Sequence, residues 1–455
     1  MEDSRVSPMG SLPDFGPVGL PGSPITAMPP ARSAYLHIPF CHRRCYYCDF
    51  AVVPLGDQAG AEPGAPGSAS IAAYLELLQR EIATSPPGPP LSTVYLGGGT
   101  PSLLSPDQVG SLLQVLRQRF GLATGAEISL ELDPASFDER RLAGYLAAGV
   151  NRVSLGGQSF DDQVLASLGR RHRRNDLQQA ISWLQQAHRN GNLASWSLDL
   201  IQAVPAPPGR PAAPGRAHWR DQLQQAIASA APHLSVYELT LEPGTVFGKR
   251  ADRGELRLAD DELAADLLEL TSTALSAAGY GHYEISNYAL PGHASRHNRV
   301  YWSGADWWGF GLGATSCQGG RRLARPRTRA AYGAWLDGLQ QQQPASEAWP
   351  LAHGLPLDER LLVGLRRREG VVMAALLSDA GLPPGCLDAH LEQLRQLLAP
   401  ERAQGLLLIE GPRWRLSAPA GMALSNAVLR KLLDWWERVG PSPTDAGPRE
   451  PGNAS

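Results

Sequence analysis

Three cysteines stand within eight residues near the start of the chain. They are Cys41, Cys45 and Cys48, in a Cys-x3-Cys-x2-Cys spacing. Three thiolates on one loop can bind three corners of an iron–sulfur cube and leave the fourth iron open for a reacting ligand. Structural zinc is the alternative, but it needs four protein ligands, so His37 or His42 would have to complete the site. The spacing favours the iron–sulfur interpretation.

A run of glycines is the second chemical signal. Residues 97–101 read Gly-Gly-Gly-Thr-Pro and follow the strand-like run Thr93–Leu96. Because glycine has no Cβ, its backbone N–H and C=O groups can approach a ligand closely. The run matches neither the phosphate-binding G-x-x-x-x-G-K-[ST] loop nor the dinucleotide-binding G-x-G-x-x-G loop. Taken alone, it is also compatible with a plain turn.

Six strand-like runs must position these motifs, and most are followed by a helical pattern. The runs are Ala34–Ile38, Thr93–Leu96, Glu127–Leu132, Arg152–Leu155, Ser195–Ile201 and Leu234–Leu241. After the second run, Ser105 is a predicted N-cap, Pro106 fits the first helical position and Gln108 can close a capping box. Repeated strand–helix units predict a parallel sheet, because each crossover helix returns the chain to the same edge.

Polar side chains fall near or just past the C-terminal ends of four of these strands. They are Glu131, Gln158, Asp199 and Glu238. Barrel enzymes collect their reacting groups at this end of the strands. A doubly wound sheet remains the alternative for an α/β chain of this pattern. The placement of the polar residues favours a partial (β/α)6 barrel.

The overall composition limits the classes of function. The 455 residues include 41 Lys and Arg against 44 Asp and Glu, for a net charge of −3, which gives no electrostatic signature of nucleic-acid binding. No run approaches the roughly 18 uncharged apolar residues of a membrane helix, and residues 1–31 lack the apolar core of a secretory signal. Cys317 and Cys386 stand alone, so the cysteines do not indicate a disulfide framework. We expect a cytoplasmic protein.

The region after the barrel changes character. An amphipathic helix is expected at Asp358–Arg368, with Leu361, Leu362 and Leu365 as its apolar side, and a hairpin at residues 406–416. This layout predicts a small winged-helix-like domain, and packing on the barrel is favoured over DNA binding because basic bias is missing. The predicted division is a disordered Pro/Gly-rich tail at 1–32, the barrel at 33–315, a linker at 316–350, the C-terminal domain at 351–439 and a disordered tail at 440–455.

Together, the cysteine loop after the first strand and the glycine run after the second resemble the radical S-adenosylmethionine (SAM) superfamily. The resemblance implies a partial (β/α)6 barrel with a [4Fe–4S] cluster on Cys41, Cys45 and Cys48, whose fourth iron is chelated by SAM. Further runs resemble the oxygen-independent coproporphyrinogen III oxidase family: YLHIPFC at 35–41, ELDP at 131–134, NRVSLG at 151–156, QSF at 158–160, LGRRH at 168–172 and YEISNY at 283–288.

The family's SAM-binding positions carry over onto matching residues. They are Tyr35, Tyr47, Gly98, Gly99, Thr100, Glu131, Gln158, Arg170 and Asp199. Glu131 and Asp199 can accept hydrogen bonds from ribose hydroxyls or an ammonium group, and Arg170 can pair with a carboxylate. Without the resemblance, Arg170 could belong to a solvated basic segment at 170–174. Glu131 and Asp199 could equally be helix caps.

Two branches share these motifs. The oxidases carry a further cysteine two residues after the cluster loop, where this chain has Phe50, and the haem chaperone (HemW) branch typically has the His-Asn-x-x-Tyr-Trp motif found here at 297–302. A solvent-accessible His297 could ligate haem iron, with Tyr301 and Trp302 packing on the macrocycle; a hydrogen-bonded structural histidine is the alternative.

The resemblance therefore implies one of two functions from different classes. The first is a haem chaperone that binds haem, the cluster and SAM and hands haem to a respiratory apoprotein, with a membrane-associated one as a candidate. The second is an oxidase that decarboxylates coproporphyrinogen III to protoporphyrinogen IX, and a radical SAM enzyme for another tetrapyrrole is a third hypothesis. The residue types at 50 and 297–302 favour the chaperone.

The chain also departs from the family pattern. Gly157 stands where valine is usual, and Ala203 replaces a glycine in the run after Asp199. We expect the extra methyl group of Ala203 to crowd the mouth of the barrel and alter the substrate pocket.

Overall fold

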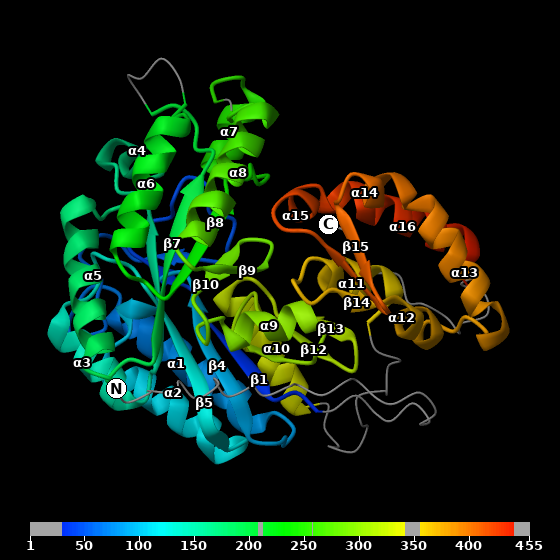
Figure 1. Ribbon diagram of the computed structural model, residues 1–455. Coiled ribbons are helices and arrows are strands. Elements are labelled where there is room, and N and C mark those ends of the chain that lie inside the picture. The colour runs from blue at the N-terminus through cyan, green and yellow to red at the C-terminus, as the bar shows by residue number, and fades with distance from the viewer. Residues whose placement is uncertain (1–29, 208–212, 257, 342–354, 441–455) are drawn as a thin grey trace, which may run out of the picture.

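The computed structural model describes residues 30–207, 213–256, 258–341 and 355–440 (Figure 1). Residues 1–29 and 441–455 hold most of the predicted tails and lie outside the described residues. The same is true of 342–354, within the predicted linker and the start of the C-terminal domain, and of 208–212.

A nine-stranded sheet forms the larger part of the molecule. Its consecutive parallel strands are β1 (Ser33–Ile38), β4 (Leu91–Gly98), β5 (Leu122–Leu132), β6 (Arg152–Gln158), β7 (Ser195–Gln202) and β8 (His233–Glu238). The six strand-like runs and their parallel order are thus confirmed. The sequence patterns missed the short edge strands β11 (Trp308–Phe310), parallel to β1, and β10 (Asn287–Ala289) with β9 (Gly281–Glu284), antiparallel beyond β8.

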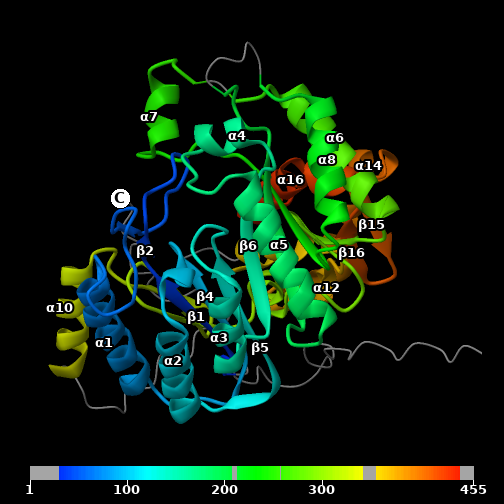
Figure 2. The same ribbon diagram turned by 90° about the vertical axis from the view of Figure 1, so that its left-hand side faces the viewer.

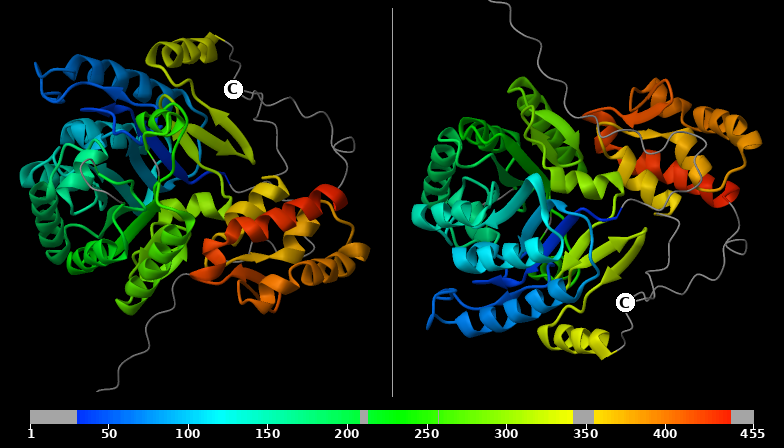
Figure 3. Two further views of the ribbon diagram at one scale, coloured as in Figure 1. Left: turned by 90° about the horizontal axis from the view of Figure 1, so that it is seen from above. Right: turned by 90° about the horizontal axis from the view of Figure 1, so that it is seen from below.

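The crossover helices cover one face of this sheet, on its outer side (Figures 2 and 3). They are α1 (Ser68–Thr84), α2 (Pro106–Arg119), α3 (Glu139–Ala148), α5 (Arg174–Arg189), α6 (Arg216–Ala228) and α8 (Asp261–Ala277). A doubly wound sheet would carry helices on both faces, so the arrangement supports the partial barrel. The predicted capping box of α2 is present: Gln108 N donates to Ser105 Oγ, and Ser105 N donates to Gln108 Oε1.

Side-chain alternation along the strands separates the apolar layer from the interior of the barrel. In β4, Val94 and Leu96 are fully buried in the hydrophobic core. Thr93 and Tyr95, on the opposite face, make polar contacts with His297 and Glu131. Because side chains alternate with a period of two, one strand builds both the core and the wall of the site.

The C-terminal domain has a hydrophobic core of its own. Its elements are α11 (Leu357–Leu365), β14 (Val371–Val372), α12 (Met373–Asp379), α13 (Pro384–Leu397), α14 (Ala399–Ala403), β15 (Leu407–Glu410), β16 (Arg413–Leu416), α15 (Ala420–Ala423) and α16 (Ser425–Val439). The predicted hairpin is confirmed, and β14 pairs with its second strand. Leu362 is exposed, which corrects the expected apolar side of α11; Leu361 and Leu365 are buried.

The two parts of the molecule meet along β9 and α9 (Arg296–Ser303). Arg368 N donates to Tyr283 O at 3.0 Å, and Arg299 of α9 pairs with Glu369. Ile285 packs against the C-terminal core. Of the helices in the described residues, none has the length and hydropathy that a bilayer span requires.

Candidate functional site

A cavity of about 430 Å³ lies at the C-terminal ends of the parallel strands. The predicted site residues that line it are Cys41, Cys45, Tyr47, Cys48, Gly98, Gly99, Thr100, Glu131, Gln158, Arg170, Asp199 and Glu238. Tyr35 is not among the lining residues; its hydroxyl lies 3.0 Å from His37 Nδ1. Segments far apart in the sequence therefore meet at one cavity, as the strand-end placement predicts.

The cysteine loop is held at its base by backbone hydrogen bonds. Cys41 ends β2 (Phe40–Cys41), and Leu55 N donates to Cys41 O at 2.8 Å. Within the loop, Cys48 N donates to Cys45 O at 3.2 Å. All three thiols are free, and burial raises the pKa of Cys41 to about 12. Metal binding would have to displace that proton, as thiolate ligation generally does.

The glycines following β4 are required by a close approach of two backbone segments. Gly98 has φ +119°, and a Cβ there would lie 2.8 Å from the ring of His37. A Cβ on Gly99 would lie 2.6 Å from Phe40 O, and Thr100 N donates to the same oxygen at 2.6 Å. The glycine run thus supports the segment that leads into the cysteine loop, a role that the sequence alone did not indicate.

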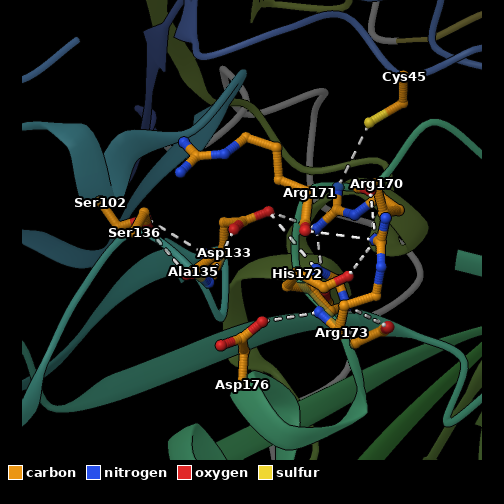
Figure 4. A network of polar contacts seen from close by, with 12 residues as sticks. Cys45, Ser102, Asp133, Ala135, Ser136, Arg170, Arg171, His172, Arg173 and Asp176 are labelled. Atoms are coloured by element: carbon orange, nitrogen blue, oxygen red, sulfur yellow. Dashed lines mark hydrogen bonds and ion pairs between the residues drawn. The ribbon is translucent and has the colours of Figure 1, made fainter. Parts of the chain in front are cut away.

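Arg170 lies between the cysteine loop and a carboxylate (Figure 4). Its Nη2 donates to Asp133 Oδ2 at 2.6 Å and to Gly156 O at 3.0 Å, and its Nη1 lies 3.6 Å from Cys45 Sγ. Its side chain is mostly buried, so the interpretation of residues 170–174 as a solvated basic segment is wrong for this residue. A fixed guanidinium beside Cys45 favours negative charge on the sulfur.

Asp133 and His172 complete this network, and neither was singled out as a site residue from the sequence. Burial acts to raise the pKa of Asp133, but the Arg170 cation outweighs burial and holds it below its usual value. His172 lies 3.0 Å from Gly157 O, and burial lowers its pKa to about 4, which keeps it neutral. The sequence feature that could have identified Asp133 is its position two residues after Glu131 in the ELDP run.

Two further carboxylates line the cavity from neighbouring parts of the sheet. Glu131 accepts from Tyr95 Oη at 2.9 Å and from Gly98 N at 3.0 Å, and burial raises its pKa to about 7. Asp199 accepts from Ser154 Oγ at 2.8 Å; burial raises its pKa, and serine hydrogen bonds offset part of that rise. Both residues lie inside strands, so the helix-cap interpretation is wrong.

The end of β6 has a strained backbone. Gln158 adopts φ +57°, a region that non-glycine residues rarely occupy and that is common at functional sites. Its buried amide oxygen has no hydrogen-bond partner within the described chain. At the neighbouring Gly157, a Cβ would lie 2.6 Å from Leu198 Cδ1, so a valine there would require Leu198 to move.

His297 is not where the haem-ligand expectation places it. The side chain is buried, with the residue only 1% exposed, so the expectation of solvent access is wrong. Its Nδ1 lies 2.8 Å from Thr93 Oγ1, and its Nε2 lies 2.8 Å from Tyr301 Oη. Burial lowers its pKa to about 3. Both ring nitrogens are engaged because α9 packs against β4, and this favours the structural alternative.

Ala203 also differs from its expected placement. It does not line the 430 Å³ cavity but borders a smaller one beside α6, so it does not crowd the mouth of the barrel. Its φ of +57° explains why glycine suits this position.

The donor set fits a multi-iron cluster better than zinc. His37, a proposed fourth zinc ligand, has Nδ1 3.0 Å from Tyr35 Oη and Nε2 2.9 Å from Ala51 O. Within the described ranges, no three His, Cys, Asp or Glu side chains converge closely enough to hold one metal ion. Three thiols that share one cavity wall can each bind a separate iron of a [4Fe–4S] cluster, with Arg170 balancing the charge.

Comparison with known proteins defines the class first. Residues 35–198 match the family model of the radical SAM superfamily. The solved structure of coproporphyrinogen III oxidase (HemN) from Escherichia coli matches with a TM-score of 0.68 and 23% identity, over 89% of this chain and 90% of that one. The fold is therefore that of a radical SAM protein with the architecture of this oxidase.

The sequence relatives then narrow the family. The chain is 43% identical to the haem chaperone HemW of Synechocystis, over 88% of this chain and 96% of the relative. It is 35% identical to the HemW of Escherichia coli, over 89% and 98%. A mitochondrial radical S-adenosyl methionine domain-containing protein 1 of Mus musculus is 32% identical, over 96% and 95%. The chain belongs to the haem chaperone HemW family.

Proposed function

We propose that this protein is a cytoplasmic haem chaperone that binds haem, a [4Fe–4S] cluster and SAM, and that it delivers haem to a respiratory apoprotein. The observation that carries the proposal is the similarity to haem chaperones over nearly the whole chain. The cavity supports it, because three free thiols and most of the polar residues expected for SAM line it.

Different residues of the chain would bind the cluster and the carboxylate of SAM. Cys41, Cys45 and Cys48 would each hold one iron of the cluster, which supplies one-electron reduction of SAM when bound. Arg170, fixed by Asp133, offers a cation beside the sulfur of Cys45 and would pair with the SAM carboxylate.

The carboxylates on the sheet would orient the rest of SAM. Glu131 receives two hydrogen bonds that favour its ionised form, so it can accept from a ribose hydroxyl or an ammonium group. Asp199 is held by Ser154 and can accept in the same way.

The second candidate is the oxidase, which the shared architecture with coproporphyrinogen III oxidase favours. Phe50 argues against it. This side chain lines the cavity and is 53% exposed where the oxidases carry a further cysteine. An exposed aromatic ring can pack on a planar ligand but cannot ligate iron or donate a thiol hydrogen.

One experiment separates the two candidates. Anaerobically reconstituted protein is incubated with SAM, a reductant and coproporphyrinogen III, and protoporphyrinogen IX is quantified beside the Escherichia coli oxidase as a positive control. In parallel, haem binding and transfer to an apo-cytochrome are followed by absorbance. We expect an intact cluster, bound haem, haem transfer and no product. Catalytic turnover would establish the oxidase, and failure to bind haem would remove the chaperone.

A further inference from the structure

We infer that α9 is a positioning element for SAM: His297 fixes Tyr95, and Tyr95 fixes the carboxylate of Glu131 in the cavity. The inference rests on the proposed function, because it takes Glu131 to face bound SAM. It assigns to the His-Asn-x-x-Tyr-Trp motif a role other than haem ligation, and it makes His297 a positioning residue that touches neither SAM nor haem.

The contacts form one continuous path from the helix to the carboxylate. The ring of His297 stacks on Tyr95 with centroids 5.1 Å apart and an interplanar angle of 23°. Tyr95 Oη then donates to Glu131 Oε1 at 2.9 Å. His297 also binds Thr93 at 2.8 Å, two residues before Tyr95 on the same face of β4. The histidine is thereby fixed to the strand whose tyrosine it orients.

Two rings stack on Tyr95. Tyr35 stacks on it with centroids 6.2 Å apart at 22°, and His297 stacks on it as well. These two contacts restrict movement of the phenol away from Glu131. A donor held in this way is preorganised, so its hydrogen bond does not have to be ordered when a ligand binds.

α9 is itself anchored to the strand that carries Glu131. The backbone N–H groups of Arg296 and His297 donate to Glu127 at 3.1 and 2.9 Å, which places a carboxylate at the helix N-terminus. Glu127 and Glu131 lie four residues apart on one face of β5. Tyr301 Oη binds His297 Nε2 at 2.8 Å and prevents rotation of the imidazole.

The same helix reaches the C-terminal domain. Arg299, two residues after His297, pairs with Glu369 at the end of the segment that follows α11. α9 thus contacts the C-terminal domain through one side chain and the wall of the cavity through another. A change at this contact would act on Tyr95 indirectly, through α9, and we expect its effect on SAM binding to be smaller than that of the direct contacts.

The test measures SAM affinity of the reconstituted protein by equilibrium dialysis, with cluster content measured in each sample. Tyr95→Phe retains the stacked ring and removes only the donor to Glu131; we expect SAM binding about tenfold weaker. His297→Ala should weaken SAM binding by a similar factor and leave haem affinity unchanged. The matched control is Arg296→Gln on the same helix, whose side chain binds Gly125 O away from Tyr95 and should leave SAM affinity unchanged.

A double-mutant cycle gives a readout that a general loss of structure would not. If His297 acts through Tyr95, the variant that combines Tyr95→Phe and His297→Ala should bind SAM no more weakly than whichever single variant has the lower SAM affinity. Wild-type SAM affinity in Tyr95→Phe and His297→Ala, with the cluster intact, would overturn the inference. So would loss of haem binding in His297→Ala with SAM binding retained, since that result makes the histidine a haem ligand.

These outcomes are distinguishable from failure of the proposed function. If the wild-type protein with an intact cluster binds no SAM, that result contradicts both SAM binding in the proposed function and the role inferred for α9. If the wild type binds SAM and the variants bind it equally well, only the inference falls. Tyr95→Phe keeps the test decisive if His297→Ala does not fold, because the phenylalanine ring fills the same space.

Discussion

The cysteine loop and α9 border the same cavity, yet their polar groups are arranged in opposite ways. The loop presents three free thiols, and the adjacent cation of Arg170 stabilises negative charge. On α9, His297 is buried and both of its nitrogens have hydrogen-bond partners. A side chain that ligates a metal must keep a lone pair available, whereas both ring nitrogens of His297 are already paired. Burial and pairing together separate the two roles.

The largest expected effect is on the cysteine loop. We expect Cys41→Ser, Cys45→Ser and Cys48→Ser combined to abolish the iron–sulfur absorbance of the reconstituted protein, because the cavity would then offer no thiolates to the cluster. Cys386→Ser is the matched control, since this thiol is exposed in the C-terminal domain and lies outside the cavity. Full [4Fe–4S] content in the triple variant would contradict the cluster assignment.

The next effect tests the claim that α9 is packed and paired. His297→Ala should lower the free energy of unfolding by about 3 kcal/mol, because it leaves a cavity and two hydroxyl groups, on Thr93 and Tyr301, without their partner. Chemical denaturation measures the change. His390→Ala, in the C-terminal domain, removes an exposed hydrogen bond and an edge contact with Trp435, and should cost less than about 1 kcal/mol. An equally small loss at His297 would show that its ring is free to take another role.

Two glutamates with similar pKa values sharpen the contrast between cavity and packed interior. Burial raises the pKa of both Glu131 and Glu284 to about 7, but only Glu131 lines the cavity. A raised carboxyl pKa makes stability fall as pH rises from about 4.5 to 7, because the unfolded chain releases its proton first. Glu284→Gln should therefore flatten the pH dependence of unfolding by up to about 3 kcal/mol, equally with and without SAM.

The result at Glu284 has a clear contrary outcome. Parallel pH curves for the wild type and Glu284→Gln would show that its pKa is not raised. A SAM-dependent difference between them would show that Glu284 senses the cavity, although it lies in the segment that meets the C-terminal domain.

The smallest effect concerns a position outside the main cavity. The left-handed backbone at Ala203 costs about 1 kcal/mol, and Ala203→Gly removes that strain. The same substitution also removes a buried methyl group that contributes about 0.8 kcal/mol. We expect the free energy of unfolding to change by less than about 0.5 kcal/mol and SAM affinity to stay the same. Altered SAM binding would show that the expected crowding of the barrel mouth is real after all.

Local patterns were sufficient for some features of the molecule. The strand runs, the capping box of α2 and the hairpin in the C-terminal domain each depend on residues close in sequence, and each was predicted. The cysteine loop and the strand-end residues Glu131 and Asp199 were brought to one cavity because parallel strands place their ends together.

Features that depend on packing between distant segments could not be predicted in the same way. The edge strand β11 is three residues long and is defined by its pairing with β1. The burial of His297 depends on Thr93, 204 residues away in the chain. The part played by Tyr95 became visible only when β4, β5 and α9 were seen together.

The most direct test of the site is electron–nuclear double resonance on the reduced cluster in the presence of SAM with an isotopically labelled amino nitrogen. Three thiols would bind three of the four irons and leave the fourth open to SAM, and Arg170, Glu131 and Asp199 line the same cavity, so we expect the labelled nitrogen to couple magnetically to the cluster. An intact, reduced cluster that shows no coupling, with SAM at saturating concentration, would contradict the assignment of this cavity as the SAM site.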